Sequence, residues 1–209
     1  DMKLAASYEK EKAELNAIRM AWRAKDTLAA LNFYAHLAGV YRMNENLDSA
    51  LYISQDACRY LIEYGYEKYA YGFLPNQIAI YLDKKKFDEV KKLIDLFEIK
   101  SSFFDDLGNI SKGKELYYFY KGKFHYGTNN IDSACYYYDK LLNNARNLGH
   151  YENAYKGLME VYHKLGKPDS VMKYAQLFAN ANDSACLISS AEEINRANAL
   201  YNYNASRRQ

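Results

Sequence analysis

The sequence predicts an all-α fold in which antiparallel helix pairs follow one another along the chain. Three observations lead to this expectation. Only 17 of the 209 residues are Val, Ile or Thr, residues that a large β-sheet would use more often. A short phrase typical of a helix start recurs four times, and residues of matching size recur at fixed distances from it. Amphipathic stretches flank this repeated region on both sides.

A repeated helix-start phrase divides the chain into units of similar length. We interpret the Asp in each phrase as the N-cap of a helix, because its carboxylate can accept hydrogen bonds from the free N–H groups of the first turn. The small residue that ends each phrase then lets that helix pack closely on its neighbour. The four phrases are Leu47-Asp48-Ser49-Ala50, Phe87-Asp88-Glu89-Val90, Ile131-Asp132-Ser133-Ala134 and Pro168-Asp169-Ser170-Val171.

Large rings lie nine residues before the last residue of each phrase, at Tyr41, Tyr81, His125 and Tyr162. These offsets fit two antiparallel helices, the first ending near the ring and the second starting at the Asp. In the third unit, we expect Gly122 and Ala134 where the two helices approach most closely. The predicted helix pairs are 27–43 with 48–64, 67–83 with 88–99, 114–127 with 132–147, and 151–165 with 169–181.

These units resemble the tetratricopeptide repeat (TPR) over roughly residues 26–182. The spacing between units exceeds the usual repeat length of that family, and Val90 and Val171 stand where it has Ala. The residues that match its pattern are Tyr34, Leu37, Tyr41, Ala50, Ala57, Tyr81, Tyr118, Gly122, Ala134, Tyr138, Tyr155, Leu158 and Tyr162. The resemblance implies an α-solenoid in which stacked helix pairs form a right-handed superhelix with a concave face.

A single helix is expected on each side of this repeated region. Residues 1–25 hold an N-terminal helix at 3–24, interpreted as half of a truncated repeat with Ala13 as its anchor. Residues 183–209 hold a C-terminal capping helix at 185–203. It is expected to bury its apolar stripe on the last helix pair and to continue beyond Gln209. The two stripes are Leu4, Tyr8, Leu15, Ile18 and Trp22, and Leu187, Ala191, Ile194 and Tyr201. The pair Arg207-Arg208 would lie near the junction with the continued helix.

Charge and composition argue against several classes of function. The 28 basic and 26 acidic side chains leave a net charge of +2, too small to hold nucleic acid or an anionic membrane. No apolar run approaches the ~18 residues that span a bilayer. We therefore expect this segment to bind no nucleic acid and to insert in no membrane.

Cys58, Cys135 and Cys186 are far apart in the sequence and are interpreted as small buried hydrophobic residues.

Catalytic and cofactor motifs are weak. The run from Gly108 to Lys114 matches the spacing of a phosphate-binding loop, but Glu115 stands where that loop needs a Ser or Thr hydroxyl for Mg²⁺. We interpret this run as a loop between repeats. The four histidines lack the spacing of a metal site, and His125 occupies a position that is Tyr in the other units. No catalytic activity, cofactor or metal site is expected.

Two Tyr-rich runs, at residues 117–120 and 136–138, cannot lie entirely in the core, because consecutive helical residues point about 100° apart. One interpretation is amphipathic packing at seams between helices, with the hydroxyl groups in water. The other is a recognition surface for a protein or peptide, since Tyr is enriched at interfaces.

The TPR resemblance implies a binding site for a protein or peptide on the concave face, which the first helix of each pair lines in that family. The middle of this face is expected to be apolar, and the last unit polar and charged. The candidate binding residues are Asn32, Arg42, Met43, Leu82, Phe119, Lys123, Tyr126, Asn153, Lys156, Glu160 and His163.

The helix-start phrases, the abundance of Tyr, Asn and Lys, and the terminal run ALYNYNASRRQ also resemble bacterial membrane-tethered TPR regulators. This narrower resemblance implies a non-catalytic sensor domain of a signalling or transcriptional regulator, held on the extracytoplasmic (periplasmic) side of the membrane. A homodimer through the C-terminal helix would be compatible with such a protein. The alternative is a cytoplasmic, soluble TPR adaptor or peptide-responsive regulator.

Overall fold

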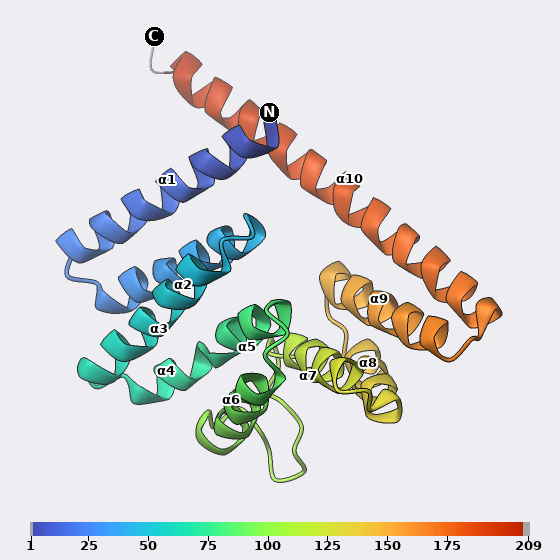
Figure 1. Cartoon of the computed structure of the whole chain (residues 1–209). Coiled ribbons are helices and arrows are strands. Elements are labelled where there is room, and N and C mark those ends of the chain that lie inside the picture. Colours follow the sequence, from blue (N-terminus) through green and yellow to red (C-terminus); the bar gives the residue numbers. More distant parts are fainter. Residues whose placement is uncertain (1, 207–209) are drawn as a thin grey trace.

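The computed structural model describes the backbone of residues 2–206 and the side chains of residues 8–191 except 68 and 189. This part of the chain is all-helical, and its only β-type pairing is an isolated bridge between Phe104 and Ile110 (Figure 1). The helices are α1 (Met2–Arg23), α2 (Thr27–Met43), α3 (Leu47–Glu63), α4 (Glu67–Gly72), α5 (Leu74–Asp83), α6 (Phe87–Lys100), α7 (Leu116–Gly127), α8 (Ile131–Asn143), α9 (Leu148–Lys164) and α10 (Pro168–Ser206). The helical fold class is confirmed, and most helix bounds lie within a few residues of the prediction.

The helix expected at 67–83 is divided in two at Phe73. Its N–H donates to the carbonyl oxygen of Ala70 at 3.0 Å, which closes α4 in a tight turn. Pro75 follows in the first turn of α5. A proline inside a continuous helix lacks the N–H donor and its ring collides with the preceding turn, so the chain starts a new helix here.

The helix starts use a different capping residue from the one expected. In α3 and α8 the N-cap is Asn46 or Asn130, whose side-chain oxygen accepts from Ser49 N or Ser133 N at 3.3 Å. The Asp of each phrase lies two residues later, inside the first turn. A carboxylate there still stabilises the helix, because it faces the positive end of the helix dipole.

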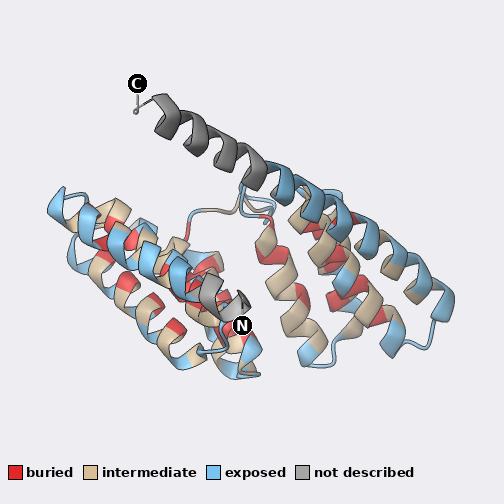
Figure 2. Cartoon of the chain, turned by 90° about the horizontal axis from the view of Figure 1, so that it is seen from above, coloured by how far each residue is buried: buried red, intermediate tan, exposed pale blue. Residues whose placement is uncertain are grey.

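Each helix packs on its neighbours along the chain, and α5, α7 and α9, the first helices of successive pairs, also contact one another in sequence. The result is the curved row of helices in Figure 1. Buried residues form stripes along the helices of this row (Figure 2). Ala50, Val90 and Ala134 are fully buried, as expected of anchor residues, whereas Val171 is half-buried.

Tyr138 of α8 forms a close contact that joins the third and fourth units. Its ring lies between two glycines of neighbouring helices, Gly122 of α7 and Gly157 of α9. A Cβ atom added at either glycine would lie 2.5 Å from the ring. The close approach expected at Gly122 is therefore present, and the group that fills the space is this ring.

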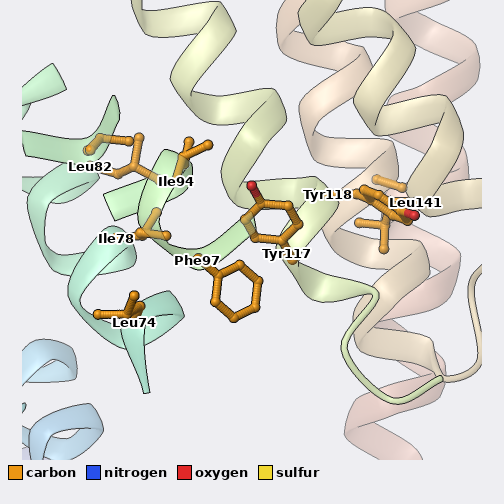
Figure 3. Close-up of a cluster of buried hydrophobic side chains, with 10 residues drawn as sticks. Leu74, Ile78, Leu82, Ile94, Phe97, Tyr117, Tyr118 and Leu141 are labelled. Carbon is orange, nitrogen blue, oxygen red and sulfur yellow. The ribbon is translucent and has the colours of Figure 1, made fainter. Parts of the chain in front are cut away.

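The largest core cluster among the described residues joins α5, α6, α7, α8 and α9 (Figure 3). Its centre is Phe97, whose ring lies 4.9 Å from that of Tyr117, measured between centroids. The loop between α6 and α7 returns to this cluster, because Phe103 and Phe104 both pack on Phe97. The loop is thereby fixed to the core.

The run that resembles a phosphate-binding loop ends at a buried carboxylate. Glu115 is 3% exposed, and its side chain accepts from Gly113 N at 2.8 Å and from Arg146 Nε at 2.6 Å. Burial alone would raise the pKa of Glu115, but its backbone hydrogen bonds and the guanidinium of Arg146 outweigh burial and lower it. The Gly113 N–H group that would face a phosphate is bonded to this carboxylate.

The first helix buries only the C-terminal part of the stripe expected of it, namely Ile18 and the half-buried Trp22. Ile18 and Ala21 are buried against α2, but Tyr8, Leu15 and Ala13 are exposed, so the anchor role expected of Ala13 is wrong. The contact with α2 is partly polar, since Tyr41 Oη donates to Glu11 Oε1 at 3.0 Å. The side chain of Leu4 lies outside the described residues.

The last helix does not fold back as a cap. Residues 168–206 form one continuous helix, α10, because no glycine or proline interrupts it after Pro168. Its first half packs on α9, whereas Leu187 is 73% exposed and Ala191 is exposed as well. The expected burial of this stripe is therefore wrong. The side chains of Ile194 and Tyr201, and the whole of Arg207-Arg208, lie outside the described residues.

Candidate protein-binding cleft

A cleft of about 550 Å³ opens where the C-terminal ends of α5, α7 and α9 lie side by side. Four of the candidate residues line it: Leu82, Lys123, Tyr126 and Glu160. We call this feature the α5/α7/α9 cleft. Its other lining residues are Asp83, Lys85, Phe87, Gly127 and Lys164.

Local packing keeps the floor of the cleft apolar. Leu82 is 5% exposed at the end of α5, and the ring of Phe87 reaches across from the start of α6. Phe87 can lie there because Gly127 has no side chain: a Cβ at Gly127 would stand 2.3 Å from the ring. The Phe87 ring also packs on Phe124, with 6.5 Å between centroids. The floor thus depends on a glycine of the third unit and a ring of the second.

An ionic bridge runs across three units at the edge of the cleft. The carboxylate of Asp83 accepts from Arg42 Nε at 2.5 Å and lies 3.5 Å from Lys123 Nζ. These residues belong to α5, α2 and α7, so one carboxylate joins the first helices of three successive pairs. The side chains are about one-third exposed, and we expect each pair to contribute less than about 1 kcal/mol.

A smaller cavity of about 40 Å³ lies beside this bridge, lined by Ala38, Gly39, Arg42, Ala79 and Tyr120, among others. Burial is the main cause that raises the pKa of the Tyr120 hydroxyl. The Tyr120 ring belongs to α7 and lines this cavity together with residues of α2 and α5. Arg42 of the ionic bridge lines it as well.

Two lysine ammonium groups of the cleft lie over aromatic rings. Lys164 Nζ is 4.9 Å from the ring centroid of Tyr126, and Lys123 Nζ is 5.8 Å from that of Phe119. Such cation–π contacts hold a charge near a ring face without neutralising it. Across the described part of the chain, Lys85, Lys164 and Glu160 form no ion pair at this surface.

Other candidate residues lie outside this cleft. Asn32 and Met43 are exposed on α2, and Lys156 and His163 are exposed on α9. Asn153 is engaged within its own helix, since its Nδ2 donates to the Gly149 carbonyl oxygen at 2.7 Å. The remaining two contribute indirectly: Arg42 anchors the ionic bridge, and Phe119 packs on Tyr138 beneath the surface.

Five lining residues of the cleft are not among the candidate binding residues: Asp83, Lys85, Phe87, Gly127 and Lys164. Lys85 lies in the turn between α5 and α6, and Phe87 is the first residue of α6. Lys85 adopts a positive φ of 55°, and its N–H donates to Leu82 O at 3.0 Å, so the turn is tightly closed. The position of Lys85 and Phe87 in the sequence could have indicated them, because they directly follow the end of α5 that faces the cleft.

Within the described residues, no group of three or more His, Cys, Asp or Glu side chains is placed to hold a metal ion. Burial raises the pKa of Cys58 to about 11, so its reactive thiolate form is scarce near neutral pH. Cys186 is exposed, and Cys58 and Cys135 are only half-buried, so the expectation of three buried cysteines is wrong.

No protein-family model matches this chain, and neither do any of the curated proteins or solved structures with which it was compared. None of the helices, as far as they are described, is long and apolar enough to cross a membrane.

Proposed function

We propose that this chain is a non-catalytic module that binds a protein or peptide, and that the partner lies in the α5/α7/α9 cleft. The observation that carries the proposal is the convergence of three separate helix ends on one cleft with an apolar floor and charged walls. Clefts of about 300–1,000 Å³ with apolar linings and a few placed polar groups are typical ligand sites.

The proposal includes a TPR-like α-solenoid as the architecture of the module. Its support is that helices contact only elements close to them in the chain, within the described residues. The anchors Ala50, Val90 and Ala134 take equivalent buried positions in successive units. Repeat arrays of this kind offer extended concave surfaces for partners.

A macromolecular partner fits the exposed aromatic and basic groups better than a small metabolite does. Tyr is enriched where proteins meet, since a ring supplies contact area at little conformational cost. Tyr126 supplies such a ring in the cleft, and the ammonium group of Lys164 lies over the face of the ring.

The place of this module in a larger protein is a further part of the proposal. Its resemblance to membrane-tethered regulators favours the sensor portion of a signalling or transcriptional regulator outside the cytoplasmic membrane. The competing assignment is a soluble cytoplasmic adaptor. Sequencing the complete reading frame distinguishes them: a signal peptide and an apolar span in the flanking sequence support the first, and their absence there supports the second.

Selection from a random 12-residue peptide library tests the binding function directly. Enriched peptides would be measured by fluorescence anisotropy against the wild-type chain, Tyr126→Ala and Tyr52→Ala. Tyr52 is the matched control, because it is 63% exposed on α3 and does not line the cleft.

We expect Tyr126→Ala to weaken binding by at least about tenfold, the size typical of an aromatic residue at the centre of an interface. Tyr52→Ala should leave the affinity unchanged, and circular dichroism should show that both variants remain helical. The proposal is wrong if no peptide is enriched, or if the two variants bind alike.

A further inference from the structure

The walls of the α5/α7/α9 cleft carry more positive than negative charge that is available to a ligand. Lys85, Lys123 and Lys164 line it together with Asp83 and Glu160. The charge of Asp83 is already satisfied, because it pairs with Arg42 as well as with Lys123. Lys85 and Lys164 then face one unpaired carboxylate, Glu160.

The partial charges of the backbone at the helix ends do not cancel this excess of positive charge. The ends of α5, α7 and α9 could present carbonyl oxygens with partial negative charge. The turn after each helix caps those carbonyls: Lys85 N donates to Leu82 O, Asn129 N to Tyr126 O and Gly166 N to His163 O. The side chains therefore dominate the charge that a bound segment meets.

The two available lysines stand on different walls of the cleft. Lys85 belongs to the closed turn after α5, and Lys164 is the last residue of α9. The ring of Tyr126 lies under the Lys164 ammonium at 4.9 Å and favours its position at the cleft. Between them the floor is apolar, formed by Leu82 and Phe87.

We propose that the cleft binds an acidic peptide segment of a protein partner, with one or more Asp or Glu side chains beside an apolar residue. The carboxylates would pair with Lys85 and Lys164, and the apolar side chain would lie on Leu82 and Phe87. This inference rests on the proposed peptide-binding function and adds the charge class of the partner. Complementary charge across an interface chiefly provides specificity and fast association.

The same peptide selection tests this inference. Enriched sequences should contain more Asp and Glu than the unselected library, together with an apolar residue. Two synthetic probes would then be compared: an enriched acidic peptide and its copy with each Asp and Glu changed to Asn and Gln. The acidic form should bind at least about tenfold more tightly at 0.1 M salt and lose most of that advantage at 1 M, where the Debye length is about 3 Å.

Charge reversal in the protein gives the second test. The double variant Lys85→Glu, Lys164→Glu should weaken the acidic peptide by more than tenfold and should bind a Lys-substituted copy more tightly than the wild type does. Lys12→Glu is the matched control, because Lys12 is exposed on α1, which packs on α2 and not on the cleft helices.

The outcomes separate the two proposals. If peptides are enriched and depend on Tyr126 but are neutral or basic, peptide binding stands and the acidic preference is overturned. If no peptide is enriched, both fail. If a single-stranded oligonucleotide or an anionic lipid vesicle binds through Lys85 and Lys164 more tightly than the acidic peptide, the assignment to a protein segment is overturned.

Discussion

The contact of Tyr138 with two glycines allows a stability prediction with a worked magnitude. In Gly157→Ala the new methyl group would lie 2.5 Å from the Tyr138 ring, and Gly122→Ala would create the same clash from the opposite helix. The ring is fully buried. Overpacking of this kind costs roughly 1–3 kcal/mol.

The alanine itself favours a helix by about 1 kcal/mol over glycine, so part of the cost is offset. Gly39→Ala measures that gain alone, because Gly39 lies within α2 and a Cβ there meets nothing within 4 Å. We therefore expect Gly39→Ala to be neutral or stabilising, while Gly122→Ala and Gly157→Ala destabilise the chain. The larger Gly122→Leu should destabilise it further.

Thermal unfolding followed by circular dichroism measures the difference. Each kcal/mol corresponds to roughly 2–4 °C in Tm for a chain of this size, so Gly157→Ala should melt clearly below Gly39→Ala. In a Tyr138→Leu background the penalty of Gly157→Ala should disappear, because the ring that it strikes is gone. Equal melting temperatures for all three glycine variants would refute the packing.

Two further predictions concern charged groups that join different units. Asp83→Asn removes the carboxylate shared by Arg42 and Lys123. Urea unfolding should show a free energy of unfolding that is lower by about 0.5–1 kcal/mol at low salt, and lower by less at 1 M salt. An equal loss at both salt concentrations would contradict an ionic role. The pKa of Glu115 is lowered in the folded state, so its contribution is present above the pKa of the unfolded chain and is lost as pH falls through the folded pKa. In Glu115→Gln, the free energy of unfolding should therefore fall less steeply as the pH drops below about pH 4.5. Urea unfolding at several pH values measures this, and an unchanged pH profile would show that Glu115 does not cause the acid destabilisation.

Local sequence signals determined most of the helices. Amphipathic spacing and polar turns placed α2, α3, α6 and α8 close to their observed bounds, because such signals act within a few residues. The same signals placed Gly122 at a close approach. The resemblance to the TPR family, and not these local signals, placed four cleft residues, including Leu82 and Tyr126, on the inward face of their helices.

Tertiary structure decided what those helices meet. The sequence shows that Tyr138 is large and that Gly157 is small, but only the packing of α7, α8 and α9 brings the ring between two glycines. The ionic bridge at Asp83 likewise joins residues about 40 positions apart. Contacts between units depend on the rotation and offset of whole helices, and no local pattern specifies these.

The cleft and the last helix also separate what the sequence determined from what the tertiary structure decided. No sequence motif places Lys85 and Phe87 in a cleft, and they line one only because α7 and α9 pack beside α5. The apolar stripe that includes Leu187 suggested a buried cap, but burial also requires a chain reversal. No glycine or proline follows Pro168, and the polar run at 180–184, where the sequence predicts a break, stays helical, so α10 runs on and leaves Leu187 exposed. Periodicity determines which residues share a face, whereas chain path determines whether another helix covers it.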